Sequence, residues 1–166
     1  MPMQTSSDLP ELWDLYDSAG NPLSRRIVRG SPMLPGEFHR LVQIWVRNAA
    51  GAYLVQQRAD NELWAATAGC VAAGEESRQT AQRELAEEMG LDVEANQLRQ
   101  VGVSRSQHAL GTAWLVEVEV ELDQLPLQSE EVLAAAWLTT DQIRRLVEHG
   151  IFYDYGTEHF ERIFTA

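Results

Sequence analysis

Residues 69–91 read GCVAAGEESRQTAQRELAEEMGL, a short loop of small residues followed by an acidic segment that suits a helix. Each residue of an α-helix turns the chain by about 100°, so residues four apart lie on the same side. Three apolar residues follow this spacing and form a stripe that can pack on a sheet: Ala81, Leu85 and Met89. Glu84 and Glu88 lie one turn apart beside this stripe, so we expect their carboxylates at the edge of the buried contact.

The two ends of this helix can also be predicted. Ser77 is expected to be the N-cap residue, because its hydroxyl can accept a backbone hydrogen bond. Gly90 is expected to end the helix, because glycine adopts the left-handed conformation without a Cβ penalty. Glu75 before the helix and Arg83 within it carry opposite charges, so we expect an ion pair that joins the loop to the helix.

Three carboxylates, those of Glu84, Glu87 and Glu88, fall close together on this helix. An acidic helix is most often a solvated surface, but acids held this close repel one another unless a cation binds between them. Hard divalent cations such as Mg²⁺ prefer oxygen ligands of this kind. Gly69 opens the loop, where we expect it to let the backbone turn tightly and to offer its carbonyl oxygen to a ligand.

The pattern Gly-x5-Glu-x7-Arg-Glu-apolar-x-Glu-Glu-x-Gly-apolar is matched at every fixed position of residues 69–91. In this respect the chain resembles the Nudix hydrolases. The resemblance implies an α/β fold, an α/β/α sandwich with a mixed sheet. It also implies hydrolysis of a nucleoside diphosphate linked to another group, in which water attacks phosphorus with the help of Mg²⁺ or Mn²⁺.

The resemblance implies a role for each residue of the motif. The metal ligands would be Glu84, Glu87 and Glu88, with a backbone carbonyl at or next to Gly69. Three further residues would have structural roles: Glu75, Arg83 and Gly90. The motif is specific for the fold and the reaction but not for the substrate, which is selected by loops outside it.

The general base and the substrate contacts are less sharply defined. Glu84 is one candidate base, and relatives often use an acid on a later loop, which here indicates Glu130 or Glu131. We include Glu131 among the catalytic candidates. Arg58 is a candidate phosphate contact, with an ordinary surface charge as the alternative, and Trp64 is a candidate for stacking on a base, with a packed loop tryptophan as the alternative.

Two other functions are alternatives to hydrolysis. The N-terminal hairpin expected at 11–30 and the flanking segment 36–59 resemble a subgroup related to isopentenyl diphosphate isomerase, whose catalytic cysteine immediately precedes the first glycine of the motif. This chain has Ala68 there, and the side chain of Cys70, beyond the glycine, is expected to point elsewhere. The second alternative is a non-catalytic nucleotide-binding Nudix module. Such regulators tend to lose the motif carboxylates and to carry a DNA-binding extension, whereas this chain keeps the carboxylates and is not expected to have room for an extension.

The 166 residues are expected to form one domain, residues 1–166, with a flexible tail at 1–10 and an N-terminal hairpin at 11–30. Thr139 and Gln142 have capping-box spacing, which predicts a helix from there to His149. The other expected strands and helix are strands at 40–47, 53–58, 100–106, 112–122 and 132–138, and a short helix at 158–163.

Composition limits the partners and the location. The net charge of −12 argues against a nucleic acid partner, although bound metal ions would still allow a small anionic diphosphate. The single cysteine excludes an internal disulfide and suits the cytoplasm. We expect no membrane span and no signal peptide, because no apolar run approaches 20 residues and the N-terminus lacks a basic region. A homodimer is a further expectation, since many relatives form one.

Overall fold

The fold is described by a computed structural model, which covers residues 9–166. The tail predicted for residues 1–10 therefore lies almost wholly outside the described residues. The strands are β1 Leu12–Tyr16, β2 Pro22–Val28, β3 His39–Arg47, β4 Tyr53–Arg58, β5 Trp64–Ala65, β6 Thr67–Cys70, β7 Arg99–Arg105, β8 Ala109–Glu117 and β9 Val132–Leu138. The helices are α1 Ser77–Met89, α2 Thr140–Glu148 and α3 Thr157–Phe164, and the 3-10 turns are η2 Ala95–Gln97 and η3 Leu122–Gln124.

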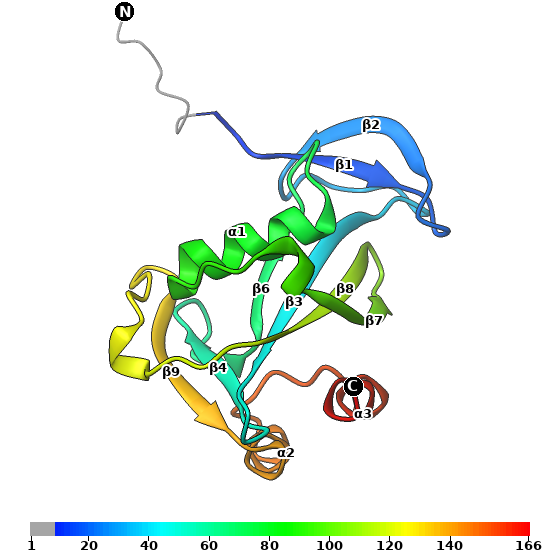
Figure 1. Cartoon of the computed structure of the whole chain (residues 1–166). Coiled ribbons are helices and arrows are strands. Elements are labelled where there is room, and N and C mark those ends of the chain that lie inside the picture. The colour runs from blue at the N-terminus through cyan, green and yellow to red at the C-terminus, as the bar shows by residue number, and fades with distance from the viewer. Residues whose placement is uncertain (1–8) are drawn as a thin grey trace, which may run out of the picture.

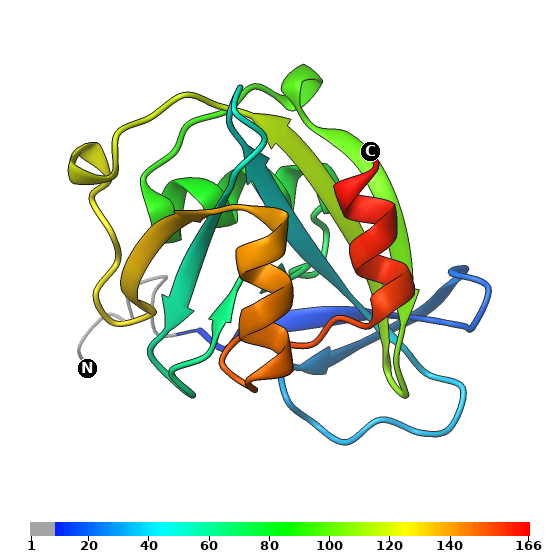
Figure 2. The same ribbon diagram turned by 90° about the horizontal axis from the view of Figure 1, so that it is seen from below.

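Seven strands form one mixed sheet with helices on both faces. Its central path is β5-β4-β3-β8-β7, and β6 and β9 pair with β3 and β4 respectively. Only the β3–β8 pair is parallel, among the pairs described for residues 9–166. Helix α1 covers one face of the sheet, and α2 and α3 cover the other (Figures 1 and 2). This arrangement confirms the predicted α/β/α sandwich with a mixed sheet.

Strand β3 supplies side chains to both hydrophobic cores, because successive residues of a strand point to opposite faces. On one face, Val42, Ile44 and Val46 pack with the α1 stripe of Ala81, Leu85 and Met89. On the other face, Trp45 packs with Phe160 and Ile163 of α3. The predicted stripe is therefore confirmed, and its burial fixes which side of α1 faces the sheet.

The neighbour of β3 changes along its length. Residues Leu41–Ile44 pair with β6, whereas only Val46 and Arg47 pair with β4. Strands β4 and β6 therefore separate beside the first half of β3, and the candidate site lies at this opening.

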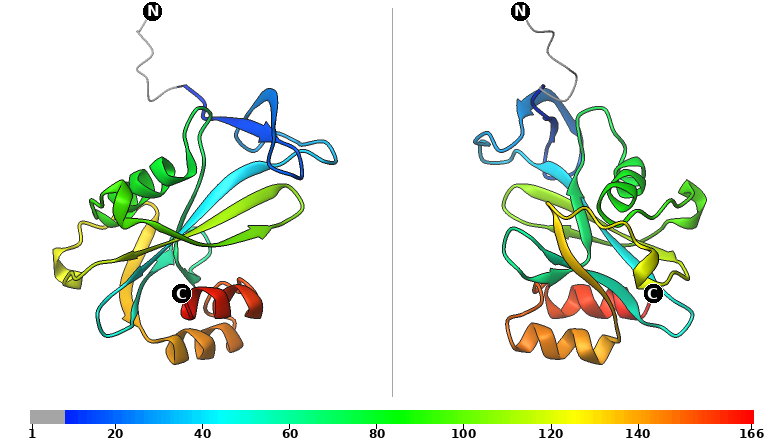
Figure 3. Two further views of the ribbon diagram at one scale, coloured as in Figure 1. Left: turned by 45° about the vertical axis from the view of Figure 1, so that its right-hand side comes forward. Right: turned by 90° about the vertical axis from the view of Figure 1, so that its left-hand side faces the viewer.

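The predicted N-terminal hairpin is confirmed as β1 and β2, a separate two-stranded sheet at one end of the large sheet (Figure 3). It has its own small core of Trp13, Leu15 and Ile27. The ring of Trp13 stacks on His39 at the start of β3, with 3.9 Å between ring centroids. This stacking, with the bridge between Tyr16 and Phe38, joins the hairpin to the sheet.

Two predicted boundaries were wrong. Ser77 is the first helical residue of α1 and not its N-cap, which is Glu76. The Glu76 N–H donates to Gln79 Oε1 at 2.9 Å, while the Ser77 hydroxyl accepts from Trp114 Nε1 at 3.0 Å. The strand predicted at 112–122 covers Ala109–Glu117, because its parallel partner β3 ends at Arg47, opposite Glu117.

The other predicted elements agree closely with the structure. β4 and β9 have the predicted bounds, and the capping box of Thr139 and Gln142 begins α2. None of the helices within residues 9–166 combines the length and the apolar character needed to cross a membrane.

The C-terminal end of α1 gives a stability prediction. Gly90 has φ 67°, and a Cβ built there would lie 2.3 Å from Pro126 Cγ. Gly150 has a similar φ of 70° but nothing within 4 Å of an added Cβ. We expect Gly150→Ala to cost about 1 kcal/mol of unfolding free energy for the left-handed backbone, and Gly90→Ala to cost roughly 2 kcal/mol more for the clash. Urea denaturation of both variants would measure the difference, and equal losses would show that Pro126 yields without cost.

Candidate active site

The three motif glutamates share one cavity of about 370 Å³ between α1, β4 and β6. Glu84, Glu87 and Glu88 all line it. The other charged residues of its lining come from four further segments of the chain and from α1 itself: Glu11, Arg29, Arg58, Arg83 and Glu131. The fold thus gathers five acids and three arginines around a space large enough for a small ligand.

Gly69 lies in β6 and allows the close approach of Glu84. A Cβ built at position 69 would lie 2.3 Å from the carboxyl carbon of Glu84. The prediction that Gly69 is needed for a tight turn was wrong, because it pairs with Val42 inside a strand. Position 69 requires glycine because the Glu84 carboxylate occupies the space that a Cβ would need.

Glu88 is the most buried of the three, at 9% exposure. Its Oε2 accepts a hydrogen bond from Gln56 Nε2 at 2.9 Å, and Gln56 Oε1 accepts from the Thr67 hydroxyl at 3.3 Å. Burial raises the pKa of Glu88 to about 7, against the lowering effect of the Gln56 hydrogen bond, and the charges of Glu84 and Glu131 raise it further. The site therefore resists a negative charge unless a cation compensates it.

The pKa of Glu84 is also raised. Burial raises its pKa, the Arg83 guanidinium lowers it, and the neighbouring Glu87 charge raises it again. Arg83 Nη1 donates to Glu84 Oε1 at 3.0 Å and to Glu87 Oε2 at 3.2 Å. One protein cation thus partly balances two of the three carboxylates.

The predicted ion pair between Glu75 and Arg83 is present and bidentate. Arg83 Nε donates to Glu75 Oε1 at 2.8 Å, and Nη2 donates to Oε2 at 3.0 Å. The Thr80 hydroxyl also donates to Glu75 Oε2, at 2.8 Å. Because Glu75 is held from two sides, it fixes the guanidinium beside the acidic cluster.

The donor set suits a hard divalent cation. Five carboxylates line one cavity, and three of them belong to a single helix. Within residues 9–166, no three acidic, histidine or cysteine side chains already surround one point as ion ligands. Glu84 and Glu87 face Arg83, and Glu88 faces Gln56. These side chains offer oxygen, which is the donor that Mg²⁺ and Mn²⁺ prefer.

Of the remaining predicted residues, some line the cavity and others lie outside it. Arg58 ends β4 and lines the cavity, with its Nε and Nη2 donating to Asp60 at 2.9 and 2.7 Å. Glu131 also lines the cavity, whereas its neighbour Glu130 is not part of the lining. Trp64 lies outside this lining and packs on the apolar cluster beneath α2 and α3. The structure therefore brings Arg58 and Glu131, but not Trp64, to the acids.

Three residues of the lining were not among the predicted site residues: Gln56, Glu11 and Arg29. Gln56 is a polar residue within the buried run of β4, and that position in YLVQQR is a usable signal. Arg29 Nη1 donates to Glu11 Oε2 at 2.9 Å, and both reach the cavity from the N-terminal hairpin region. Their arrival depends on how the hairpin packs, which no local pattern encodes.

The wall of the cavity also bears on the isomerase alternative. Ala68, at the position of the isomerase cysteine, lies in the wall. Cys70 lies there too, so the expectation that it points elsewhere was wrong. Residues 68 and 70 are two apart in one strand and therefore share a face. Burial raises the pKa of the Cys70 thiol, which disfavours the reactive thiolate.

Comparisons with known proteins agree with this geometry. The NUDIX domain family matches residues 37–158. An uncharacterized Nudix hydrolase of Listeria innocua is 32% identical over 151 residues, which cover 87% of this chain and 89% of that protein. A Deinococcus radiodurans protein has a similar fold, with a TM-score of 0.76 and 17% identity over 92% of this chain and 98% of its own.

A third protein was solved with a ligand. The NUDIX domain of Shewanella oneidensis NrtR, complexed with ADP ribose, has a TM-score of 0.58 and 16% identity over 76% of this chain and 86% of its own. Together, the motif, the shared cavity and the match over residues 37–158 identify the chain as a member of the Nudix family, a Nudix pyrophosphohydrolase.

Proposed function

We propose that this protein hydrolyses a nucleoside diphosphate linked to another group, or a related organic diphosphate, with Mg²⁺ or Mn²⁺ as cofactor. The observation that carries the proposal is the shared cavity of Glu84, Glu87, Glu88 and Glu131. When bound, the divalent ion supplies neutralisation of the diphosphate and activation of a water molecule. Because the carboxylates repel one another, they favour a bound cation over an empty cluster.

Each residue of the site has a separate role in this proposal. Glu84, Glu87 and Glu88 would hold the ion, and the Gly69 carbonyl is a further candidate ligand. Arg58 would bind a phosphate oxygen at the side of the cavity, where its guanidinium is already steadied by Asp60. Glu131 would accept the proton of the attacking water, since it faces the acids from a separate loop.

The choice of substrate class is supported by the ADP-ribose complex of the Shewanella oneidensis NUDIX domain, which shares this fold. Isopentenyl diphosphate isomerisation is disfavoured by Ala68 in the cavity wall, and a purely non-catalytic binding role by the complete set of motif carboxylates. A homodimer and a cytoplasmic location stay predictions from the sequence.

The metal assignment predicts the effect of removing single charges. Glu87→Gln and Glu88→Gln should each lower kcat by about 100-fold or more, because each loses a carboxylate that would hold the ion while keeping its shape. A screen of diphosphate compounds with Mg²⁺ and Mn²⁺, assayed for phosphate-containing products, supplies the substrate. Glu148→Gln, an exposed change on α2, is the matched control. Full activity in both motif variants, with circular dichroism unchanged, would show that the metal assignment is wrong.

Two adjacent acids allow a sharp test of the general base. Glu131 lines the cavity and Glu130 does not, although they are neighbours on the same loop. Glu131→Gln should lower kcat by about 100-fold, whereas Glu130→Gln should leave it within about twofold of the unaltered protein. Steady-state kinetics over pH 5 to 9 would measure both. Equal activity of the two variants would exclude Glu131 and leave Glu84 as the candidate base.

The buried Glu88 also predicts how stability depends on pH in metal-free protein. Its pKa is raised from 4.5 to about 7, so between these values the folded protein keeps a proton that the unfolded chain has released. The free energy of unfolding should therefore fall as pH rises through this window. Urea denaturation at pH 5 and pH 8 with EDTA would measure the fall, which should be smaller in Glu88→Gln. An identical fall in both proteins would contradict the assignment.

A further inference from the structure

A groove of about 560 Å³ lies between the turn of the N-terminal hairpin, the start of α1 and the β7–β8 pair. It opens on the α1 face of the sheet, because the alternate β8 residues Leu110, Thr112 and Trp114 line it and Trp114 belongs to the core beneath α1. No described residue lines both this groove and the acid cavity. The groove is therefore a separate space at the beginning of α1.

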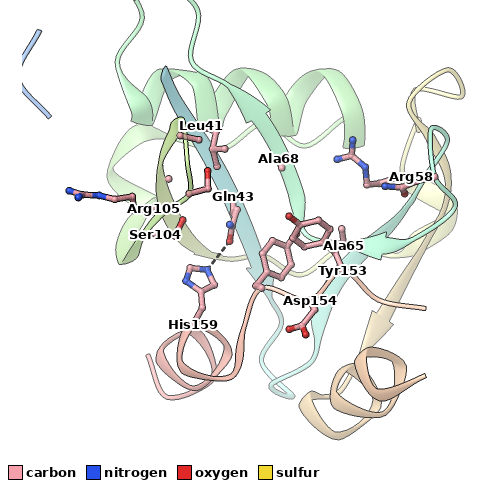
Figure 4. Close-up of a pocket in the computed structure, with 15 residues that line it drawn as sticks. Leu41, Gln43, Arg58, Ala65, Ala68, Ser104, Arg105, Tyr153, Asp154 and His159 are labelled. Carbon is pink, nitrogen blue, oxygen red and sulfur yellow. Dashed lines mark hydrogen bonds between the residues drawn. The ribbon is translucent and has the colours of Figure 1, made fainter. Parts of the chain in front are cut away.

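The groove is also distinct from the cavity on the other face of the sheet. That cavity, of about 390 Å³, adjoins the acid cavity and shares Leu41, Arg58 and Ala68 with it. Arg105 of β7 lies between it and the groove. Because Arg105 pairs with Leu110, its side chain is on the α1 face, and Figure 4 shows it pointing away from the other cavity.

The lining of the groove has an unusual charge for this protein. Its charged residues, among those that the structure describes, are Arg40 and Arg105. The chain carries 25 acidic residues and a net charge of −12, and five acids line the acid cavity alone. The other polar residues of the groove are mostly hydroxyl-bearing: Ser18, Ser77, Ser104 and Thr112. Cations and hydroxyl groups without a carboxylate are the donors that an anion requires.

Both arginines reach the same turn of the hairpin. Arg40 Nη2 donates to the Gly20 carbonyl at 3.1 Å, and Arg105 Nη2 donates to the Ser18 carbonyl. The two carbonyl groups are only two residues apart, so the turn draws two guanidinium groups toward one place. A guanidinium keeps its charge at any pH at which proteins are folded, and two like charges held together repel unless an anion lies between them.

The nearby acids do not offset this charge. Asp17 in the same turn accepts from two N–H groups of its own loop and is not part of the lining. Glu75 and Glu76 line an adjoining space of about 510 Å³ together with Arg78, and Glu75 is already held by Arg83. Within residues 9–166, neither Arg40 nor Arg105 forms an ion pair with a carboxylate. The groove therefore favours a negatively charged ligand.

Ser77 supplies a donor on the opposite wall. Its hydroxyl oxygen accepts from Trp114 Nε1 at 3.0 Å, which leaves the hydroxyl hydrogen to donate elsewhere. Ser77 is also the first residue of α1. An anion bound between the two arginines and this hydroxyl would thus contact the helix whose later turns carry the three motif glutamates.

The shape of the groove indicates the class of anion. The planar fork of arginine matches phosphate oxygens, and hydroxyl groups can donate to the oxygens that remain. The space is larger than one phosphate group needs, and Leu110 and the 57% exposed Val103 give it an apolar side. A long polyanion is disfavoured, because the net charge of −12 surrounds this small positive region. A small organic phosphate meets all three conditions.

We propose that the groove binds a small phosphate monoester with an apolar group, its phosphate held by Arg40 and Arg105 beside the Ser77 hydroxyl. This would be a second anion site, which needs no divalent ion and lies apart from the acid cavity. It extends the protein beyond the proposed hydrolysis and does not depend on it, because none of its residues belongs to the proposed catalytic set.

Two-dimensional ¹H–¹⁵N NMR of the full chain in EDTA tests the site. The probes are inorganic phosphate and phenyl phosphate, with sodium chloride at equal ionic strength as the comparison. Both phosphates should shift the amide signals of Gly20, Ser77 and Gly111, while Gly69 reports binding in the acid cavity separately. Phenyl phosphate should bind at least about threefold more tightly than inorganic phosphate, because its ring can cover Val103 and Leu110.

Single charge removals locate the binding. Arg40→Gln and Arg105→Gln should each weaken both probes about tenfold, because each removes a charge-assisted contact. Arg145→Gln is the matched control, since this exposed arginine of α2 loses the same charge outside the groove. Arg58→Gln should alter the shift at Gly69 and leave the groove signals unchanged. If Arg40→Gln disturbs the fold, because Arg40 also lies over the Tyr16 ring at 4.0 Å, the exposed Arg105 decides the question.

Three results would overturn the proposal. In the first, sodium chloride shifts the groove amides as much as phosphate does, or phosphate shifts only Gly69. In the second, a folded Arg105→Gln binds both probes as the unaltered protein does. In the third, phenyl phosphate binds no more tightly than inorganic phosphate. Failure of the proposed hydrolysis would leave all of these measurements unchanged, because they involve neither turnover nor a metal ion.

Discussion

The close approach of the Glu84 carboxylate to the backbone of β6 is the constraint on which the site depends. The carboxyl group fills the space where residue 69 would otherwise carry a Cβ. For this to occur, α1 must lie tightly on the sheet, and the burial of Ala81, Leu85 and Met89 supplies the free energy that holds it there. The same docking presses Glu88 against Gln56 of β4. Apolar packing along one side of α1 thus offsets the cost of removing two carboxylates from water.

Arg83 reduces the repulsion between two of the carboxylates but does not neutralise the whole cluster. Its guanidinium contacts Glu84 and Glu87 but is fixed by the bidentate pair with Glu75, which Thr80 also contacts. A cation held in this way cannot follow the two acids if their side chains rotate toward the cavity. It lowers their repulsion while leaving them free to exchange one partner for another. Within residues 9–166 the hydrogen-bond partner of the Glu88 carboxylate is Gln56 and not an arginine, and burial raises its pKa to about 7.

The parts of the site that could be predicted from sequence are those set by short-range geometry. The ion pair of Glu75 and Arg83, the apolar stripe and the left-handed Gly90 all lie within one loop and one helix, where spacing determines contact. Contacts between residues far apart in sequence determine the features that the local pattern predicted wrongly. The Ser77 hydroxyl accepts a hydrogen bond from Trp114 and does not cap the helix as predicted. The strand predicted at 112–122 ends earlier because its partner β3 ends at Arg47. Glu131 lines the cavity and Glu130 does not, a difference that depends on the path of the loop before β9.

The division of the sheet beside β3 explains why the motif reveals the reaction but not the substrate. β3 pairs with β6 near Leu41 and with β4 near Val46, and the space between these neighbours connects two cavities through Leu41, Ala68 and Arg58. The acid cavity takes four of its lining residues from one helix, Arg83, Glu84, Glu87 and Glu88, so a compact motif encodes much of it. The other end is assembled from β3, β8 and the segment before α3, whose residues are far apart in sequence and meet only in the folded chain. A residue such as Gln43 is therefore visible in sequence only as one polar interruption of a buried strand, and its partner His159 comes from the other end of the chain. Scattered substitutions can therefore alter this end while α1 and its fit to Gly69 stay the same.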